Sequence, residues 1–356
     1  MRFVRLANAF GPEFRYTIVA MDGAFDAAGL LRSDIAVDLA APDNRRLPHS
    51  AMWLRSLIRR VSPDLVITNN WGAIDAVLAS LLLRLCPTIH SEDGFGSDEA
   101  IKLKPRRVLT RRLLLNQIHT TVLPSKTLLR IAREQYRVRE SKLTYIPNGI
   151  DTDRFRPGLC SDLRQKFCAT PDTTVFGFLG HLRPEKTVDV LIQAFAKAHL
   201  SDAVLILVGD GPCRPQLETL ARDLGVANDV YFAGHTDDPQ PYLSAFDVVA
   251  LSSATEQMPL CVLEAMACGL PVISTDVGDC AEMLGTRTAP VITPRSDVAA
   301  YSTCLSTLAQ RPDLRIAIGE ANRVRCANTY SLGKMTTAYA RLYENAMDGR
   351  KLALAS

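Results

Sequence analysis

The second half of the chain alternates short apolar runs with segments of helical periodicity. Apolar runs occupy residues 175–180, 203–208, 230–233, 246–251 and 271–275. Helical stretches lie between them at residues 187–199, 214–224, 241–245 and 260–268. Uninterrupted apolar strands that alternate with helices are typical of a parallel sheet that is covered on both faces. We therefore predict an α/β domain whose ligand-binding loops follow the carboxyl ends of its strands.

The first half follows the same pattern less regularly. Expected strands lie at residues 16–20, 65–68, 88–89, 120–123 and 143–146, and expected helices at residues 3–10, 51–60 and 73–85. The segment Ile146–Asp151 combines a proline, an Asn-Gly pair and an aspartate, which is typical of a turn between structural units. We predict an N-terminal domain at residues 1–148, a C-terminal domain at residues 149–330, and a last segment, residues 331–356, whose helix packs back on the first domain.

Composition limits the class of protein. The chain has 356 residues, of which 47% are hydrophobic and 22% charged, so a disordered or fibrous chain is excluded. Its apolar runs are shorter than the ~18 residues that a membrane span requires, and its polar first ten residues do not resemble a signal peptide. Nine cysteines without a Cys-x-x-Cys pair are typical of reduced thiols. These features predict a cytoplasmic protein.

Charge divides the chain into a basic and an acidic part. Residues 1–150 hold 22 Lys and Arg against 14 Asp and Glu, whereas the remaining residues hold 19 against 24. A basic domain indicates contact with an anionic surface, and local drift in composition is the alternative explanation.

The segment Lys102–Arg112, KLKPRRVLTRR, contains six basic residues and no acid. At ~1 kcal/mol per basic residue near anionic lipid, it could hold the protein on the inner face of the cytoplasmic membrane. A helix here would intermix basic and apolar residues, which is not typical of an amphipathic membrane anchor, and a solvated basic segment is the alternative. The segment has no interleaved aromatic residues, so we expect no nucleic-acid binding.

Two glutamates flank a predicted helix start. Glu256 is expected in a loop after a strand, and Glu264 lies within the next helix. Pro259 suits the first helical turn, and the free N–H groups that follow it would form an anion site suited to phosphate. A carboxylate before this site could bond sugar hydroxyls, and one farther along could hold a ribose. A solvated Glu256 and a structural Glu264 are the alternative.

Residues 252–278, SSATEQMPLCVLEAMACGLPVISTDVG, resemble the family-4 retaining glycosyltransferases, which have the GT-B fold. The segments GHLRPEK at residues 180–186, GDGP at residues 209–212 and IPNGID at residues 146–151 extend the resemblance. It implies two Rossmann-like α/β domains that face each other across a cleft. It also implies a UDP- or GDP-sugar as the donor substrate, held by the C-terminal domain, and no separate cofactor.

The resemblance assigns roles on the donor side. Glu256 would contact the donor sugar hydroxyls, Glu264 would bond the ribose, and Lys186 would neutralise the diphosphate. Where the family has an arginine after the glycine, this chain has His181, with Arg183 two residues later. Both are candidates to hold the diphosphate, and a capping role is the alternative for His181. The remaining predicted donor-binding residues act through their backbone or pocket shape: Gly209, Asp210, Gly234, Met258, Pro259 and Leu260.

On the acceptor side the resemblance points to residues after a predicted strand. His90 would face the reacting sugar as a catalytic residue, and a turn histidine is the alternative. Glu92, Asp93 and Gly94 would form the acceptor-side loop, where a carboxylate could bond or deprotonate an acceptor hydroxyl. The pair Asp151 and Asp153 lies in the linker, so we predict no metal site.

Members of the family begin with a strand and a glycine-rich turn, whereas this sequence begins in the expected first helix. We therefore expect the N-terminal domain to lack its first strand and glycine loop, and the upstream coding sequence to supply them. The leading interpretation is a retaining, metal-independent hexosyltransferase of bacterial surface polysaccharide or lipopolysaccharide synthesis, acting on a glycan or lipid-linked acceptor. A weakly active or inactive nucleotide-sugar-binding subunit and a GT-B nucleotide-sugar epimerase are the alternatives.

Overall fold

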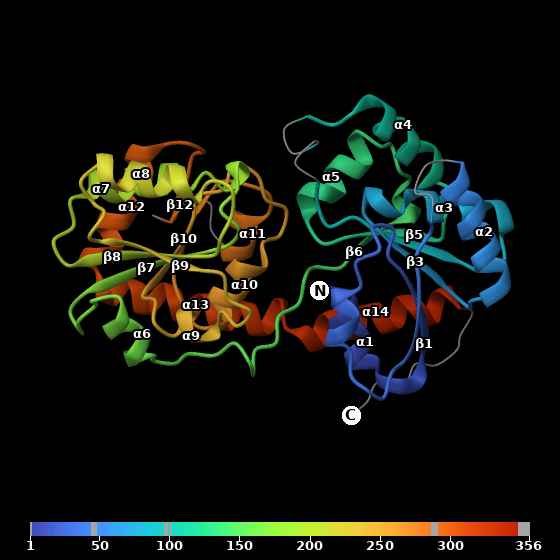
Figure 1. Ribbon diagram of the computed structural model, residues 1–356, viewed down its shortest axis with the longest axis horizontal. Helices are drawn as coiled ribbons and strands as arrows, with labels where there is room; N and C mark the ends of the chain where they lie inside the picture. Colours follow the sequence, from blue (N-terminus) through green and yellow to red (C-terminus); the bar gives the residue numbers. More distant parts are fainter. Residues whose placement is uncertain (1, 44–47, 96–98, 100–101, 286–290, 348–356) are drawn as a thin grey trace. The chain divides into compact units, whose positions relative to one another are not determined.

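The computed structural model describes residues 2–43, 48–95, 99, 102–285 and 291–347. The chain forms two units (Figure 1). Unit 1 comprises Met1–Asn148 and Gly333–Ser356, and unit 2 comprises Gly149–Leu332.

Unit 2 is built on a six-stranded sheet in which every paired neighbour is parallel. The strands stand in the order β12-β11-β10-β7-β8-β9. Their bounds are β7 (Thr174–Leu179), β8 (Ala203–Val208), β9 (Val230–Gly234), β10 (Val248–Leu251), β11 (Val272–Thr275) and β12 (Ile292–Thr293). The α/β class and the strands predicted for this half are confirmed.

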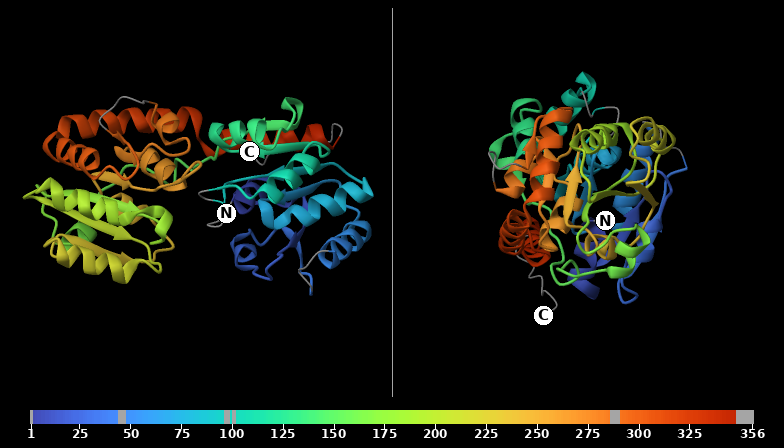
Figure 2. Two further views of the ribbon diagram at one scale, coloured as in Figure 1. Left: turned by 90° about the horizontal axis from the view of Figure 1, so that it is seen from above. Right: turned by 90° about the vertical axis from the view of Figure 1, so that its left-hand side faces the viewer.

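Two cores cover the two faces of this sheet, as the layered helices in Figures 1 and 2 show. Side chains of a strand alternate between faces, so Phe176 and Phe178 pack into one core, whereas Val175 and Leu179 pack into the other. The first core contains residues of α7 (Val188–Ala198), α8 (Arg214–Asp223) and α12 (Val298–Gln310). The second contains residues of α9 (Gln240–Leu243), α10 (Leu260–Ala267), α11 (Cys280–Leu284) and α13 (Pro312–Thr329), with α6 (Ser161–Lys166) beside it.

Unit 1 contains two parallel sheets among its described residues. The larger has the order β3-β4-β5-β6, and β1 pairs separately with β2. The bounds are β1 (Arg15–Val19), β2 (Ala36–Ala40), β3 (Val66–Asn69), β4 (Thr88–Ser91), β5 (Thr120–Leu123) and β6 (Leu143–Tyr145). The helices are α1 (Arg2–Phe10), α2 (His49–Val61), α3 (Ile74–Leu83), α4 (Pro105–Leu114), α5 (Lys126–Glu134) and α14 (Leu332–Ala346).

Aromatic packing fastens α14 to the start of the chain within unit 1. The Phe10 ring lies 5.7 Å from that of Tyr343, and the Tyr343 ring lies 5.8 Å from that of Tyr339. Edge-to-face aromatic pairs of this kind add about 0.5–1.5 kcal/mol beyond the area they bury. The first and last described helices of unit 1 therefore share one core.

Candidate active site

The order in which the chain adds strands to the sheet of unit 2 reverses at one place. From the central β7 the chain adds β8 and then β9 on one side, and β10, β11 and β12 on the other. Ligands of open α/β sheets bind at the carboxyl ends of the strands on either side of such a reversal. The loops that follow β7 and β10 therefore define the place where a ligand of this unit is expected.

An ion pair joins these two loops. Lys186 ends a short 3-10 turn after β7 (Pro184–Lys186), and its Nζ donates to Oε1 of Glu256 in the loop after β10. Ser253 Oγ donates to the same carboxylate oxygen at 2.8 Å. The side chains of Lys186 and Glu256 are 22% and 13% exposed. Burial alone would lower the pKa of Lys186, but the Glu256 carboxylate raises it above its ordinary value, so Lys186 keeps its positive charge.

The backbone holds both loops in register. Ala254 N donates to Glu185 O at 2.9 Å, and Ser252 Oγ donates to Lys186 O at 2.9 Å. Thr187 Oγ1 donates in turn to Ser252 O at 2.5 Å. Because these three hydrogen bonds join the loops after β7 and β10, the ion pair is positioned before any ligand arrives.

A close backbone approach fixes the Glu256 loop from its other side. A Cβ atom on Gly278 would lie 2.4 Å from Glu256 O, and the φ angle of Gly278 is +52°. Asp279 N donates to Gln257 O at 2.9 Å next to this contact. Only glycine permits this approach without moving the loop.

Helix α10 begins directly after this loop. Pro259 precedes its first residue, Leu260, and no side chain caps the helix. The first N–H groups of a helix lack intrahelical partners and attract anions. Met258 is buried, and Glu264 is half-buried one turn farther along the helix. The structure thus brings Met258, Pro259 and Leu260 to the same loop end as Glu256.

Three glycines meet at the ends of β7, β8 and β9. Gly180 N donates to Val208 O at 3.0 Å, and Gly209 N donates to Gly234 O at 2.8 Å. A Cβ atom on Gly209, whose φ is +136°, would lie 1.9 Å from Gly180 O. Any other residue at Gly209 would therefore push the two loops apart.

The predicted polar residues of this edge differ in their surroundings. Asp210 Oδ1 accepts a bond from Gly211 N at 2.7 Å, and its other oxygen lies 3.5 Å from Arg214 Nη1. His181 and Arg183 are exposed beyond Gly180. Arg214 was not predicted from the sequence. It is also bonded to Glu218, and the spacing of four residues between opposite charges on a predicted helix is the signal that could have indicated it.

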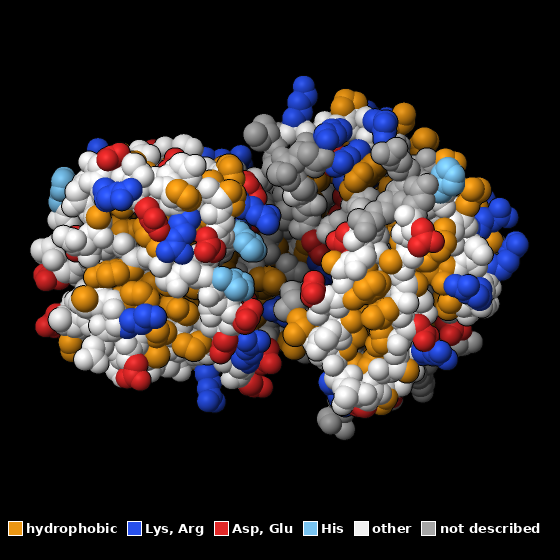
Figure 3. Space-filling model, in the orientation of Figure 1, with side chains coloured by type: hydrophobic (Ala, Val, Ile, Leu, Met, Phe, Trp, Pro, Cys, Tyr) orange, Lys and Arg blue, Asp and Glu red, His pale blue; other side chains and the backbone are white. Residues whose placement is uncertain are grey.

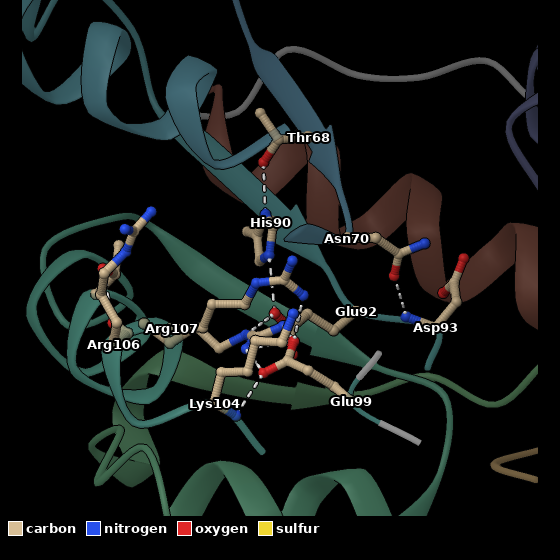
Figure 4. A network of polar contacts seen from close by, with 11 residues as sticks. Thr68, Asn70, His90, Glu92, Asp93, Glu99, Lys104, Arg106 and Arg107 are labelled. Atoms are coloured by element: carbon tan, nitrogen blue, oxygen red, sulfur yellow. Dashed lines mark hydrogen bonds and ion pairs between the residues drawn. The ribbon is translucent and has the colours of Figure 1, made fainter. Parts of the chain in front are cut away.

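In unit 1, strand register aligns the groups around His90. Thr68 of β3 pairs with His90 of β4, and His90 pairs with Thr121 of β5. Thr68 Oγ1 lies 2.8 Å from His90 Nδ1 (Figure 4). His90 is 0% exposed, and within the described residues its Nε2 makes no hydrogen bond.

Glu92 lies in a sealed ion pair beside this histidine. Its Oε1 is 3.5 Å from His90 Nε2 (Figure 4). The same oxygen accepts a bond from Arg111 Nε at 2.5 Å. The side chains of Glu92 and Arg111 are 2% and 1% exposed. Burial raises the pKa of Glu92, but His90 and Arg111 outweigh it and hold the pKa below its ordinary value. The other carboxylate oxygen of Glu92, Oε2, is buried and has no hydrogen-bond partner within the described residues.

Arg111 is the centre of a larger network. Its Nη1 also lies 3.3 Å from both carboxylate oxygens of Glu99, and its guanidinium stands 5.1 Å and 5.0 Å from the Trp71 and Tyr136 rings. Arg107 Nη1 donates to Glu99 Oε2 at 2.9 Å. Two arginines of the basic segment are therefore directed into unit 1.

Other basic residues of this segment face outward. Lys102, Lys104 and Arg106 are exposed. The exposed leucines of α4, Leu109 and Leu113, are 54% and 57% exposed. Figure 3 shows Lys and Arg side chains beside hydrophobic ones over this helix. The basic surface is thus smaller than the six residues of the sequence suggest.

Asp93 joins the acceptor-side loop to the ends of unit 1. Its N donates to Asn70 Oδ1 at 2.8 Å (Figure 4). Its carboxylate pairs with Arg2, which also donates to Tyr339 OH at 2.8 Å. The position of Asp93 and of the following Gly94 is therefore set by α1 and α14.

Within the described ranges, no three His, Cys, Asp or Glu side chains are grouped as metal ligands would be. All nine cysteines are free. No helix in the described part of the chain is both long and apolar enough to cross a membrane.

Two family models match the chain. The model described as Glycosyltransferase Family 4 matches residues 3–154, and the model described as Glycosyl transferases group 1 matches residues 173–311.

Curated relatives match over different lengths. D-inositol 3-phosphate glycosyltransferase of Saccharomonospora viridis is 32% identical over 357 residues, which cover 96% of this chain and 78% of the relative. The enzyme of that name from Actinosynnema mirum is 32% identical over 227 residues, 60% of this chain and 54% of the relative. A GDP-mannose-dependent phosphatidylinositol monomannoside mannosyltransferase of Mycobacterium tuberculosis is 32% identical over 51% of each chain. The chain thus spans about half the length of two of these relatives.

Solved structures share the fold. HepE of Anabaena in complex with UDP has a TM-score of 0.84 and 20% identity, and the match covers 97% of this chain and 95% of HepE. WaaG, a glycosyltransferase involved in lipopolysaccharide biosynthesis, has a TM-score of 0.70 and 17% identity over 97% of this chain and 95% of WaaG.

Proposed function

The chain belongs to the family-4 glycosyltransferases of the GT-B fold, and we propose that it transfers a sugar, with retention, from a nucleoside diphosphate sugar to a hydroxyl group of a glycan or lipid-linked acceptor. The observation that carries this proposal is the Lys186–Glu256 pair, which lies at the strand reversal of unit 2 beside the start of α10.

The charge that develops during the reaction accounts for the position of the Lys186–Glu256 pair. As the glycosidic bond breaks, the diphosphate leaving group gains negative charge, and fixed positive groups lower the barrier most when they meet that charge. Lys186 supplies a full charge, and the amides at the start of α10 supply a partial one. Glu256 holds the ammonium group in place until the diphosphate arrives, and its carboxylate is then released to the donor sugar hydroxyls.

The other donor contacts follow from the same edge of the sheet. We assign the base and ribose to the backbone of Gly209 and Gly234, which are hydrogen-bonded to each other, with Asp210 beside them. Glu264 is assigned to the ribose, and the exposed His181 and Arg183 to the diphosphate. We propose that Lys186 and the helix start meet the charge of the diphosphate without a divalent metal. Unchanged turnover in excess EDTA is the expected result.

His90 is the predicted catalytic residue of unit 1. Thr68 fixes its Nδ1, whereas its Nε2 faces the Glu92 carboxylate at 3.5 Å and makes no hydrogen bond within the described residues. We assign that nitrogen to the reacting sugar, with Asp93 and Gly94 shaping the acceptor side and Glu92 acting through His90 rather than on the acceptor.

The donor and acceptor are proposed from the relatives' names. HepE has been solved with UDP-glucose, and the mycobacterial relative depends on GDP-mannose, so we propose a UDP- or GDP-hexose. We propose an acceptor of bacterial surface polysaccharide or lipopolysaccharide synthesis. The relatives named for inositol 3-phosphate, for phosphatidylinositol monomannoside and for L-malate supply the competing acceptors. A cytoplasmic enzyme on the inner membrane face is consistent with the exposed Lys102, Lys104 and Arg106.

The test combines a donor and acceptor panel with one substitution. Glu256→Gln should lower kcat by about 10²–10³-fold, the loss expected when one group that acts in the transition state is removed. Glu320→Gln is the matched control, because Glu320 is exposed on α13 of the same unit. Both variants should keep the unfolding temperature of the parent protein.

Three results would contradict parts of the proposal. Full turnover of Glu256→Gln would remove Glu256 from the site. A product with inverted anomeric configuration by NMR would exclude retention. Conversion of the donor sugar without any acceptor would favour the epimerase.

A further inference from the structure

A pocket of about 500 Å³ lies in unit 1 at the amino ends of three neighbouring strands. Pro87 directly precedes β4, His119 precedes β5 and Lys142 precedes β6, and all three line the pocket. Arg84, the residue that ends α3, lines it as well. The volume lies within the range of about 300–1,000 Å³ that small-molecule sites occupy.

This pocket is separate from the candidate active site. His90 lies near the carboxyl end of β4, whereas Thr88, which lines the pocket, begins the same strand. Because the strands are parallel, all their carboxyl ends lie along one edge of the sheet and all their amino ends along the other. The two sites therefore occupy opposite edges of the unit 1 sheet.

The pocket is strongly cationic. Arg84, Arg139 and Lys142 line it, and none of the twelve described residues that line it carries a carboxylate. Within the described part of the chain, the side chains of Arg84 and Lys142 form no ion pair. Arg139 Nη2 donates to Asn116 O at 2.8 Å, which leaves most of its five N–H donors for another partner.

Helix ends account for only part of this charge. Two helices end next to the pocket: the cap residue of α3 is Arg84, and α4 ends at Leu114, two residues before Asn116. Each helix C-terminus carries about half a negative charge, so the two offset about one of the three cations. Burial and the nearby Asp64 carboxylate raise the pKa of Cys86, which lines the pocket. Asp64 itself is not among the lining residues. The surplus positive charge indicates an anionic ligand.

We propose that this pocket binds a phosphate-bearing anion through Arg84, Arg139 and Lys142. Arginine forks bind phosphate oxygens in pairs, and lysine adds a mobile charge. Leu81 and Ile118 line the same pocket and would pack against the rest of the ligand. The source is either a soluble phosphate compound or the headgroup of an anionic lipid. The proposal is independent of the proposed function, because no residue of the pocket belongs to the donor or acceptor side.

Cys86 gives a local readout of occupancy. It is half-buried in the pocket, so a bound anion should shield it from iodoacetamide, and peptide mass spectrometry follows each cysteine separately. With inorganic pyrophosphate at ten times its Kd, the pocket is occupied about 90% of the time, and alkylation of Cys86 should slow about tenfold. The exposed Cys168 of unit 2 should react at an unchanged rate.

Variants decide whether the protection arises in the pocket. The double variant Arg84→Gln/Lys142→Gln should lose the protection of Cys86. The matched control Arg55→Gln/Lys197→Gln, which removes two exposed charges elsewhere, should keep it, and so should Lys186→Ala. Protection that persists in the Arg84→Gln/Lys142→Gln variant would overturn the proposal.

A second arm separates the two sources. Protection by soluble pyrophosphate identifies a free phosphate compound. Protection only by phosphatidylglycerol vesicles, and not by phosphatidylcholine vesicles, identifies a lipid headgroup. Unchanged alkylation of Cys86 with both probes would overturn the anion site.

Discussion

Each unit of this protein contains a cation–carboxylate pair next to predicted site residues, and the two pairs differ in their access to solvent. In unit 2 the side chains of Lys186 and Glu256 are 22% and 13% exposed. In unit 1 those of Arg111 and Glu92 are 1% and 2% exposed. A ligand can replace one partner of the first pair, whereas breaking the second leaves a charge buried without compensation. The comparison suggests that the first pair binds substrate and the second positions its neighbours.

The largest expected effect comes from breaking the sealed pair. Arg111→Met should lower the free energy of unfolding of unit 1 by about 3–5 kcal/mol, because Glu92 and Glu99 lose their buried partner. The chain has two tryptophans, Trp53 and Trp71, and both lie in unit 1. Tryptophan emission during urea unfolding therefore reports on this unit alone.

Arg106→Met is the control for that measurement. Arg106 is exposed on the same helix, and surface substitutions usually change stability by no more than about 0.5 kcal/mol. Equal unfolding midpoints for the two variants would contradict a stabilising role for the buried Arg111–Glu92 pair.

Breaking the more exposed pair, Lys186–Glu256, should affect turnover instead of stability. Lys186→Ala should lower kcat by about 10²–10³-fold, because the charge on the leaving diphosphate loses its fixed cation. Unfolding should change by no more than about 1 kcal/mol, since partly exposed pairs contribute little. Steady-state kinetics and circular dichroism check both statements, with the exposed Lys197→Gln as control. A large loss of stability with normal kcat would reverse the assignment.

The two pairs also differ in how far the sequence could predict them. Lys186 and Glu256 lie 70 positions apart, but each follows a strongly apolar strand, and strand ends of a parallel sheet meet at one edge. The periodicity of the second half therefore predicted the α/β class and ligand-binding loops at the strand ends. The family resemblance supplied the roles.

Arg111 was not predictable in the same way. Its local sequence is basic, and its partners Glu92 and Glu99 lie 19 and 12 positions away across a loop. Local charge patterns indicate a solvated face, and only tertiary packing turns this residue inward. Strand β2 was missed for a related reason, because its residues Ala36–Ala40 are mostly exposed and show no clear alternation. The helices α5, α12 and α13 were also absent from the prediction.

A smaller effect is expected at the bond that fixes His90. Thr68→Val keeps the shape of the side chain but removes the hydroxyl 2.8 Å from His90 Nδ1. A buried polar atom left without its partner costs about 1–3 kcal/mol, so the midpoint of tryptophan-detected unfolding should fall. Thr110→Val, on the surface turn of α4, should leave that midpoint unchanged. If kcat drops while the midpoint does not, the threonine orients His90 without stabilising the unit.

The smallest expected effect is a pH dependence that is confined to unit 1. The pKa of Glu92 is lowered in the folded protein, so its contribution to stability is fully present above the unfolded pKa of about 4.3. That contribution is lost as the pH falls through the lower, folded value, because the unfolded state then binds the additional proton. Tryptophan-detected stability should therefore be level between about pH 7 and 5 with respect to Glu92, and should fall below about pH 4 with a slope of up to 1.4 kcal/mol per pH unit for one proton. Glu92→Gln should be less stable at pH 7 and should lose this share of the acid slope. Identical acid slopes for the parent protein and Glu92→Gln would show that the sealed pair does not govern the acid stability of unit 1.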